Sequence, residues 1–199
     1  MLAEIGEQPA MFERVLRCCG SEVAGVARQV AMRAPRFVLL AGRGTSDHAA
    51  LYAKYLVEIR LGLPAGLVSP STTTLYDAHT SMRDVLYIAV SQSGSSPDLI
   101  ESLDRARASG ATTLAVTNAP DSDLARQSEF SVYVRAGTER SVAATKSYTA
   151  QLLSLFVLIE AIAGREGSEA SGLADLAAEI LAQEARIKDI CCRYRFAEQ

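Results

Sequence analysis

Short, almost uninterrupted apolar runs recur along this chain, and each leads into a turn of glycines and hydroxyl side chains. Three of these runs, at 37–41, 85–90 and 130–134, are strongly apolar. Such runs are typical of strands buried on both faces of a parallel sheet. Helix-like stretches separate them. The chain is therefore predicted to form a three-layer αβα sandwich around a five-stranded, mainly parallel sheet with right-handed connections.

The spacing of apolar residues places the individual elements. Strands are expected at 37–41, 65–68, 85–90, 113–117 and 130–134, and helices at 9–32, 46–62, 97–109, 145–164 and 173–192. A Ser/Thr-rich stretch covers 69–74, and a turn covers 118–121. We accordingly divide the chain into an N-terminal helix (1–35), a central α/β domain (36–165), and a linker with a C-terminal helix (166–199).

Composition and charge exclude several classes of protein. The 199 residues are 49% hydrophobic and carry a net charge of −3, with no long run of basic residues, which argues against nucleic acid as a partner. No segment is long and apolar enough to predict a membrane span, and no leader sequence is recognisable. The four cysteines form two adjacent pairs without metal-ligand spacing. We expect a cytoplasmic protein with neither metal nor cofactor.

The polar turns predict an anion site. The first contains Gly42-Arg43-Gly44-Thr45-Ser46, the second runs from Ser91 to Asp98, and a third candidate covers 136–139. Backbone N–H groups, hydroxyls and the positive end of a helix dipole suit a phosphate at such places. Helix capping by Ser46 and Ser96 is the structural alternative.

Two familiar nucleotide motifs do not fit these turns. A dinucleotide-binding turn would need a third glycine where Asp47 stands, and an acidic residue where the second strand ends at Ser69. The P-loop lysine pattern is absent. A serine triad has no support either, because the two histidines, His48 and His79, lack a suitable spacing. The turns therefore favour a sugar-phosphate or nucleotide ligand without either motif.

Three motifs in this order resemble the sugar isomerase (SIS) domain: 44–46 (Gly-Thr-Ser), 91–94 (Ser-Gln-Ser-Gly) and 141–147 (Ser-Val-Ala-Ala-Thr-Lys-Ser). The opening Glu4–Pro9 resembles the segment that begins the isomerase half of glutamine–fructose-6-phosphate transaminases. The third motif looks more like that of isomerising glucosamine-6-phosphate deaminases. The resemblance runs from about residue 4 to 165 and implies the flavodoxin-like SIS fold.

The resemblance also implies a set of ligand-binding residues. Those expected around the phosphate and nearby sugar hydroxyls are Gly44, Thr45, Ser46, Ser91, Gln92, Ser93 and Ser96, and those expected to line the sugar through backbone groups are Val142 and Ala144. Glu139 and Lys146 flank the third loop and are expected to form a structural ion pair. Arg43 is left open between a contact to phosphate and a place at a subunit boundary.

The implied function is sugar-phosphate binding within an aldose–ketose isomerase or deaminase acting on fructose 6-phosphate or glucosamine 6-phosphate. The chemistry would be metal-free proton transfer. In these families two SIS halves follow each other, and the proton-transfer glutamate lies in the second. This chain looks like the first half, so its catalytic residues are unknown and we expect it to be inactive alone.

Two other functions are weighed against the enzyme module. SIS domains also serve as sugar-phosphate sensors in transcription regulators, behind a helix-turn-helix. Here the roughly 35 residues before the first strand predict a single helix that is not basic, which favours the enzyme. A purely structural half whose loops bind nothing is the third alternative. We also expect a homodimer, because the apolar helix at 145–164 should be covered on more than one side.

Overall fold

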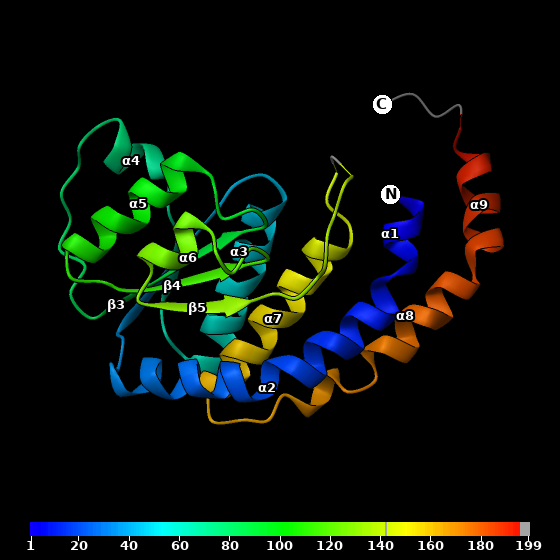
Figure 1. Ribbon diagram of the computed structural model, residues 1–199, viewed down its shortest axis with the longest axis horizontal. Helices are drawn as coiled ribbons and strands as arrows, with labels where there is room; N and C mark the ends of the chain where they lie inside the picture. The colour runs from blue at the N-terminus through cyan, green and yellow to red at the C-terminus, as the bar shows by residue number, and fades with distance from the viewer. Residues whose placement is uncertain (142, 196–199) are drawn as a thin grey trace.

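The computed structural model describes residues 1–141 and 143–195 and contains an all-parallel sheet (Figure 1). Its order, β2-β1-β3-β4-β5, is that of flavodoxin-like sheets. The predicted α/β sandwich is confirmed. The strands are β1 (Phe37–Gly42), β2 (Ala65–Leu67), β3 (Val85–Ser91), β4 (Thr112–Thr117) and β5 (Phe130–Tyr133).

The sheet has its switch point between β1 and β3. β1 pairs with β2 on one side and with β3 on the other, so the connections that leave these two strands turn in opposite directions. The register runs from Phe37 opposite Val85 to Gly42 opposite Val90. The carboxyl ends of β1 and β3 therefore lie side by side, where open α/β sheets usually bind their ligands.

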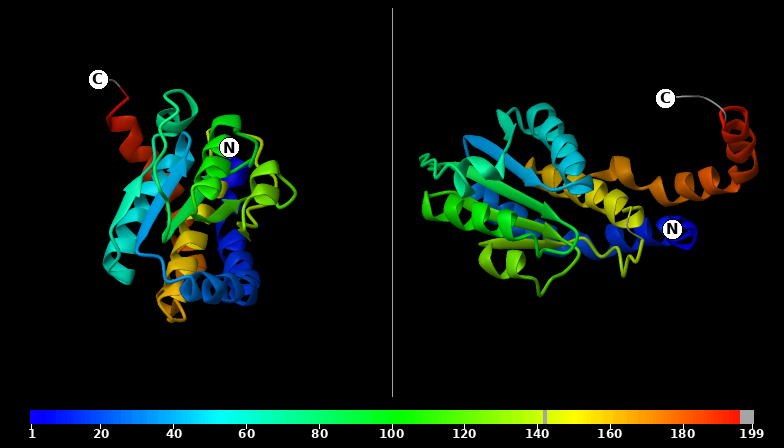
Figure 2. Two further views of the ribbon diagram at one scale, coloured as in Figure 1. Left: turned by 90° about the vertical axis from the view of Figure 1, so that its left-hand side faces the viewer. Right: turned by 90° about the horizontal axis from the view of Figure 1, so that it is seen from above.

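Helices cover both faces of the sheet. One face is covered by α2, α3 and α7, and the other by α4, α5 and α6 (Figures 1 and 2). A π-helical turn (Val57–Leu61) extends α3, and a 3-10 turn (Ser168–Ala170) follows α7. The helices are α1 (Leu2–Gly6), α2 (Gln8–Met32), α3 (Thr45–Leu56), α4 (Pro70–Thr74), α5 (Pro97–Ala108), α6 (Asp123–Gln127), α7 (Lys146–Ile162), α8 (Leu173–Ala182) and α9 (Glu184–Arg193).

Two hydrophobic cores follow from the alternation of side chains along the strands. Leu40 and Ile88 point to the larger core, under α2, α3 and α7. Tyr87 and Ala89 point to the smaller one, under α5. The Tyr87 hydroxyl is 2.8 Å from the Ser102 hydroxyl, and burial raises the pKa of Tyr87 to about 12. The central strand β3 is thus apolar on both faces, as its sequence predicts.

The C-terminal helix expected at 173–192 is the main error in the predicted elements. It is two helices, because α8 ends at Ala182 and Gln183 adopts φ −90° and ψ 14°. α8 rests on α2, whereas no residue of α9 is buried. Residues of α9 line a hollow shared with α1 but join neither hydrophobic core, and the pair of helices extends away from the sheet as an arm (Figure 2).

Smaller differences concern short elements that have no apolar period of their own. The Ser/Thr-rich stretch contains α4, and α6 was not expected at all. The Ser122 hydroxyl caps α6 by accepting the Ala125 N–H at 3.4 Å. Within the described ranges no helix has both the length and the apolarity required to cross a bilayer.

Candidate functional site

The β1–α3 loop (residues 42–46) depends on two glycines. A Cβ at Gly42 would lie 2.5 Å from the carbonyl oxygen of Ser46, so only glycine lets the first turn of α3 pack against the strand end. Gly44 is the N-cap residue of α3 and has a φ of +56°, a value that favours glycine. The positive end of α3 therefore opens directly beyond β1.

Ser46 has a structural partner within the chain. Its hydroxyl is buried and lies 3.1 Å from Nε2 and 3.2 Å from Oε1 of Gln151 in α7. It makes no capping hydrogen bond, so the capping alternative does not describe Ser46. Thr45, the first residue of α3, is half-buried. The Ser46–Gln151 contact brings α7 beside the β1–α3 loop, although β5 lies three strands away from β1.

The β3–α5 loop (residues 91–96) is held by hydrogen bonds within the loop and to the segment after β4. The buried Ser91 hydroxyl accepts the Gly94 N–H at 3.0 Å. Gly94 has a φ of +62°, and a Cβ there would lie 2.5 Å from the Cβ of Ser122. The Gly94 carbonyl accepts the Leu124 N–H at 3.1 Å, and Asn118 N–H donates to the Gln92 carbonyl at 3.2 Å. Hydrogen bonds within the chain thus fix the shape of the loop.

Hydroxyl groups remain exposed at the start of α5. Ser93 and Ser95 are exposed, and their hydroxyls lie 2.8 Å apart. Ser96 is the N-cap residue of this 12-residue helix but makes no side-chain capping bond, and Gln92 is half-buried. Capping therefore does not account for Ser96 either. Pro97 occupies the first turn, as the sequence predicts.

Arg43 connects the two loops. Its Nε lies 3.3 Å from Oδ2 of Asp98 in the first turn of α5, and its side chain is 62% exposed. A polar cavity of about 360 Å³ lies beside it, between the β1–α3 loop and the segment that follows β2. The cavity is lined by Gly42, Arg43, Gly44, Asp47, Val68, Ser69, Pro70 and Ser71.

The third turn does not offer the N-terminus of α7 to a ligand, because the Glu139 side chain already binds there. Its carboxylate accepts the Thr145 N–H at 2.7 Å and the Thr145 hydroxyl at 2.8 Å, and it also accepts the Ser147 hydroxyl. Partial burial raises the pKa of Glu139, but these hydrogen bonds outweigh it, and the pKa lies below its ordinary value. The protein's own carboxylate thus neutralises the positive end of α7.

The expected ion pair between Glu139 and Lys146 was wrong. The Lys146 side chain is only 2% exposed, and its Nζ lies 2.6 Å from Oε2 of Glu7. Of the two expected sugar-lining residues, Val142 lies outside the described residues. Ala144 is half-buried, just before α7. Sequence reasoning also missed the side chains that hold the loops, such as Gln151 and Glu4. Glu4 lies in the opening segment 4–9, whose resemblance implied no role for it.

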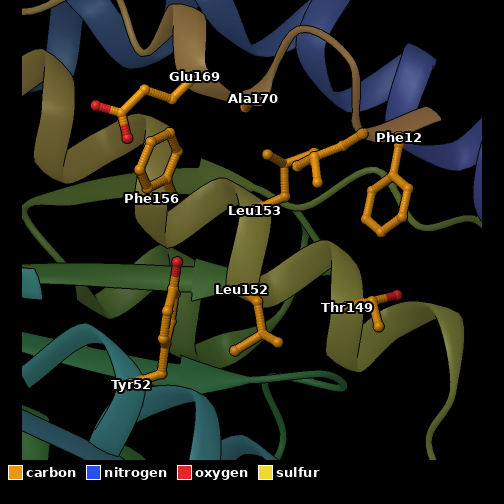
Figure 3. Close-up of a pocket in the computed structure, with 9 residues that line it drawn as sticks. Phe12, Tyr52, Thr149, Leu152, Leu153, Phe156, Glu169 and Ala170 are labelled. Atoms are coloured by element: carbon orange, nitrogen blue, oxygen red, sulfur yellow. The ribbon is translucent and has the colours of Figure 1, made fainter. Parts of the chain in front are cut away.

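An apolar groove lies on the outer side of α7, away from the strand ends. It has a volume of about 330 Å³ and is lined by residues of α2, α3, α7 and the segment after α7. Figure 3 shows the Tyr52 hydroxyl pointing toward Phe156 across this groove. Burial raises the pKa of Tyr52. The sheet, α2 and α3 already cover much of α7 within one chain.

Comparison with known sequences identifies the fold family. The SIS domain profile matches residues 32–161. The isomerizing glutamine–fructose-6-phosphate aminotransferase of Symbiobacterium thermophilum is 36% identical over 213 aligned residues, covering 95% of this chain and 34% of that protein. The enzyme of the same name from Methanothermobacter thermautotrophicus is 38% identical over 166 residues, covering 83% of this chain and 27% of that protein. The chain thus spans about a third of such relatives, or less.

Solved structures that resemble this chain belong to proteins with similar descriptions. A protein from Silicibacter pomeroyi DSS-3, provisionally described as a phosphosugar isomerase, is 37% identical with a TM-score of 0.84, covering 88% of this chain and 55% of that one. The C-terminal domain of glucosamine–fructose-6-phosphate aminotransferase from Francisella tularensis is 25% identical with a TM-score of 0.79, covering 96% of this chain and 57% of that one.

Proposed function

Because this chain belongs to the SIS domain family, we propose that its β1–α3 and β3–α5 loops bind the phosphate of a sugar phosphate. The observation that carries the proposal is the meeting of two hydroxyl-rich turns at the switch point of the sheet. Each turn leads into a 12-residue helix, so two positive helix ends converge there. A phosphate dianion suits such a place without a lysine.

The individual hydroxyls divide into shaping and binding groups. Thr45, Ser93 and Ser96 are at least partly accessible and serve as donors to phosphate oxygens. Ser91 uses its oxygen to accept the Gly94 N–H, which leaves its own proton for a ligand. Ser46 contributes its backbone and holds α7 in place through Gln151. Hydrogen bonds to a charged acceptor of this kind are stronger than neutral ones.

The proposed ligands are fructose 6-phosphate and glucosamine 6-phosphate, and the parent reaction is aldose–ketose isomerisation or deamination. The names of the relatives support this class, since they are aminotransferases and phosphosugar isomerases. Glu139 is a poor general base, because its hydrogen bonds lower its pKa. We therefore expect the 199-residue chain to bind sugar phosphate without catalysing proton transfer.

Calorimetric titration of fructose 6-phosphate and glucosamine 6-phosphate tests the phosphate site. Thr45→Ala and Ser93→Ala should each weaken binding by about 1.5–3 kcal/mol, the contribution of a hydrogen bond to a charged group. Ser171→Ala, an exposed serine outside both loops, is the matched control. Unchanged binding in both loop variants would disprove the site.

Exchange of the C2 proton of glucosamine 6-phosphate in D₂O tests the absence of catalysis. We expect none with this chain alone. Exchange that is lost in Glu139→Gln would show that this half carries its own base.

Self-association stays a prediction. The partly exposed groove outside α7 and the exposed Tyr55 and Ile59 on the α3 side are apolar surfaces that a second copy could cover. Light scattering that shows a strict monomer at tens of micromolar would contradict the homodimer.

A further inference from the structure

The N-terminal helix α1 is hydrogen-bonded to the β5–α7 loop. This loop, described at residues 134–141 and 143–145, has no regular secondary structure. Its backbone polar groups need partners, because unpaired buried ones cost free energy. Side chains supply many of them, and Glu4 of α1 is separated from its partner Arg140 by 136 residues of sequence.

Glu4 makes the central contact. It is 8% exposed, its Oε1 accepts the N–H groups of Arg140 and, at 3.3 Å, of Ser141, and its Oε2 accepts the Ser141 hydroxyl. The Arg140 backbone bond and then the Ser141 hydroxyl lower the pKa of Glu4 to about 2. The carboxylate is therefore charged at neutral pH and accepts three donors from two consecutive residues.

Two further contacts hold the beginning of α7. The buried Nζ of Lys146 is 2.6 Å from Glu7, and the Thr149 hydroxyl donates to the Gln8 side chain at 3.1 Å. A polar hollow of about 690 Å³ separates α1 from the loop elsewhere, and both sides line it. Side-chain hydrogen bonds and one ion pair thus connect α1 and the start of α2 to the loop and the start of α7.

The other end of the loop is fixed independently of α1. The Asn118 side chain donates to the Gly137 carbonyl and accepts the Ala136 N–H, both at 2.8 Å. Arg14 of α2 donates to the carbonyls of Arg135 and Ala136. Glu139 holds its own turn to Thr145. Loss of the Glu4 contacts would therefore release the middle of the loop, at 140–141, while its ends stay attached.

We propose that Glu4 is a positioning residue that fixes the β5–α7 loop for the sugar part of the ligand. This inference rests on the proposed function and on the expectation, implied by the resemblance to SIS domains, that Ala144 of this loop lines the sugar. Glu4 makes no contact with the β1–α3 or β3–α5 loops that the structure records, and glycine packing shapes those loops. Loss of the Glu4 side chain should therefore weaken binding of the sugar part of the ligand and leave binding of its phosphate unchanged.

The test compares sugar phosphates with inorganic phosphate as calorimetric ligands of the full 199-residue chain. In Glu4→Ala we expect the Kd for fructose 6-phosphate or glucosamine 6-phosphate to rise about tenfold, with the Kd for inorganic phosphate changed less than about twofold. Glu4→Gln, which keeps one acceptor oxygen, should fall in between. Glu13→Ala, exposed on α2, is the matched control.

Amide hydrogen exchange gives a second readout. The N–H groups of Arg140 and Ser141 should exchange faster in Glu4→Ala, while the Gly94 N–H keeps its protection. Equal weakening of phosphate and sugar-phosphate binding would overturn the inference, as would sugar-phosphate binding that Glu4→Ala leaves unchanged. If the wild-type chain binds no sugar phosphate at all, the proposed function fails, and this inference fails with it.

Discussion

The β3–α5 loop and the β5–α7 loop both follow strands of one sheet, but different interactions hold them. The β3–α5 loop is short and is held mainly through backbone groups, with the Ser91 hydroxyl on the Gly94 N–H and the Gln92 and Gly94 carbonyls on backbone N–H groups. The β5–α7 loop depends on distant side chains, chiefly Glu4, 136 residues from Arg140. The first is shaped by backbone hydrogen bonds and glycine packing, and the second by remote side chains.

This difference between the loops suggests that phosphate affinity and sugar selectivity depend on different parts of the molecule. A loop built from glycine packing tolerates no added side chain, and its contacts outside the loop are mostly to backbone groups, such as the N–H groups of Asn118 and Leu124. A loop held by remote carboxylates tolerates sequence change within itself and fails when its partners move. We therefore expect phosphate affinity to follow the glycines and sugar selectivity to follow α1.

The largest effect is expected from Gly94→Ala. The added Cβ would collide with the Ser122 side chain, and the residue would have to keep a φ of +62°, so both crowding and backbone strain oppose the substitution. The free energy of unfolding should fall by about 2–4 kcal/mol. Gly62→Ala is a matched control, because Gly62 has a φ of +65° and open space around it, and should cost only about 1 kcal/mol. Equal costs in urea unfolding would refute the packing argument.

Removing one or the other partner of the Glu7–Lys146 ion pair, at the start of α7, should have unequal effects on stability. Glu7→Ala leaves the buried Lys146 without its partner and should lower the free energy of unfolding by about 1–3 kcal/mol. Lys146→Met removes the buried charge and leaves Glu7, whose side chain is 53% exposed, to water. Lys146→Met should therefore lower the free energy of unfolding by less than Glu7→Ala does. Urea unfolding of both variants decides, and a greater cost for Lys146→Met would contradict this account of the pair.

Acid should loosen the β5–α7 loop through Glu4. Its pKa is about 2 in the folded protein against an ordinary value of 4.5, so the unfolded chain takes up the proton first. The stabilisation is therefore fully present above about pH 4.5 and is lost as pH falls toward 2. Unfolding measured between about pH 3 and 6 should show a shallower pH dependence in Glu4→Gln than in wild type. An identical slope in both proteins would show that Glu4 does not contribute, and Glu13→Gln serves as the control.

The smallest effect is expected at Arg43. Its pair with Asp98 is largely exposed, so Arg43→Ala should change the free energy of unfolding by no more than about 0.5 kcal/mol. Titration with inorganic phosphate then separates the two roles left open for this residue. Weaker binding would place Arg43 at the phosphate, and unchanged binding together with a changed oligomeric state would place it at a subunit boundary.

The strands and the two short loops could be predicted from the sequence because their determinants are local. Apolar runs such as 85–90 fix a strand buried on both faces, and glycine with serine fixes the turn that follows. The split of the C-terminal helix at Gln183 could not be predicted in this way. Its residues have helical spacing throughout, and the break appears only in the structure, where α8 packs on α2 while no residue of α9 is buried.

The partners of charged side chains were the least predictable part of the site. Lys146 and Glu139 are seven residues apart in sequence and were expected to pair, yet Lys146 reaches Glu7, and Glu139 takes the Thr145 and Ser147 donors. The sequence by itself determined the sheet, its apolar faces and the glycine turns, because each depends on neighbours along the chain. The tertiary structure alone decided which carboxylate meets which donor, because those groups meet only after α1 and α2 pack against α7.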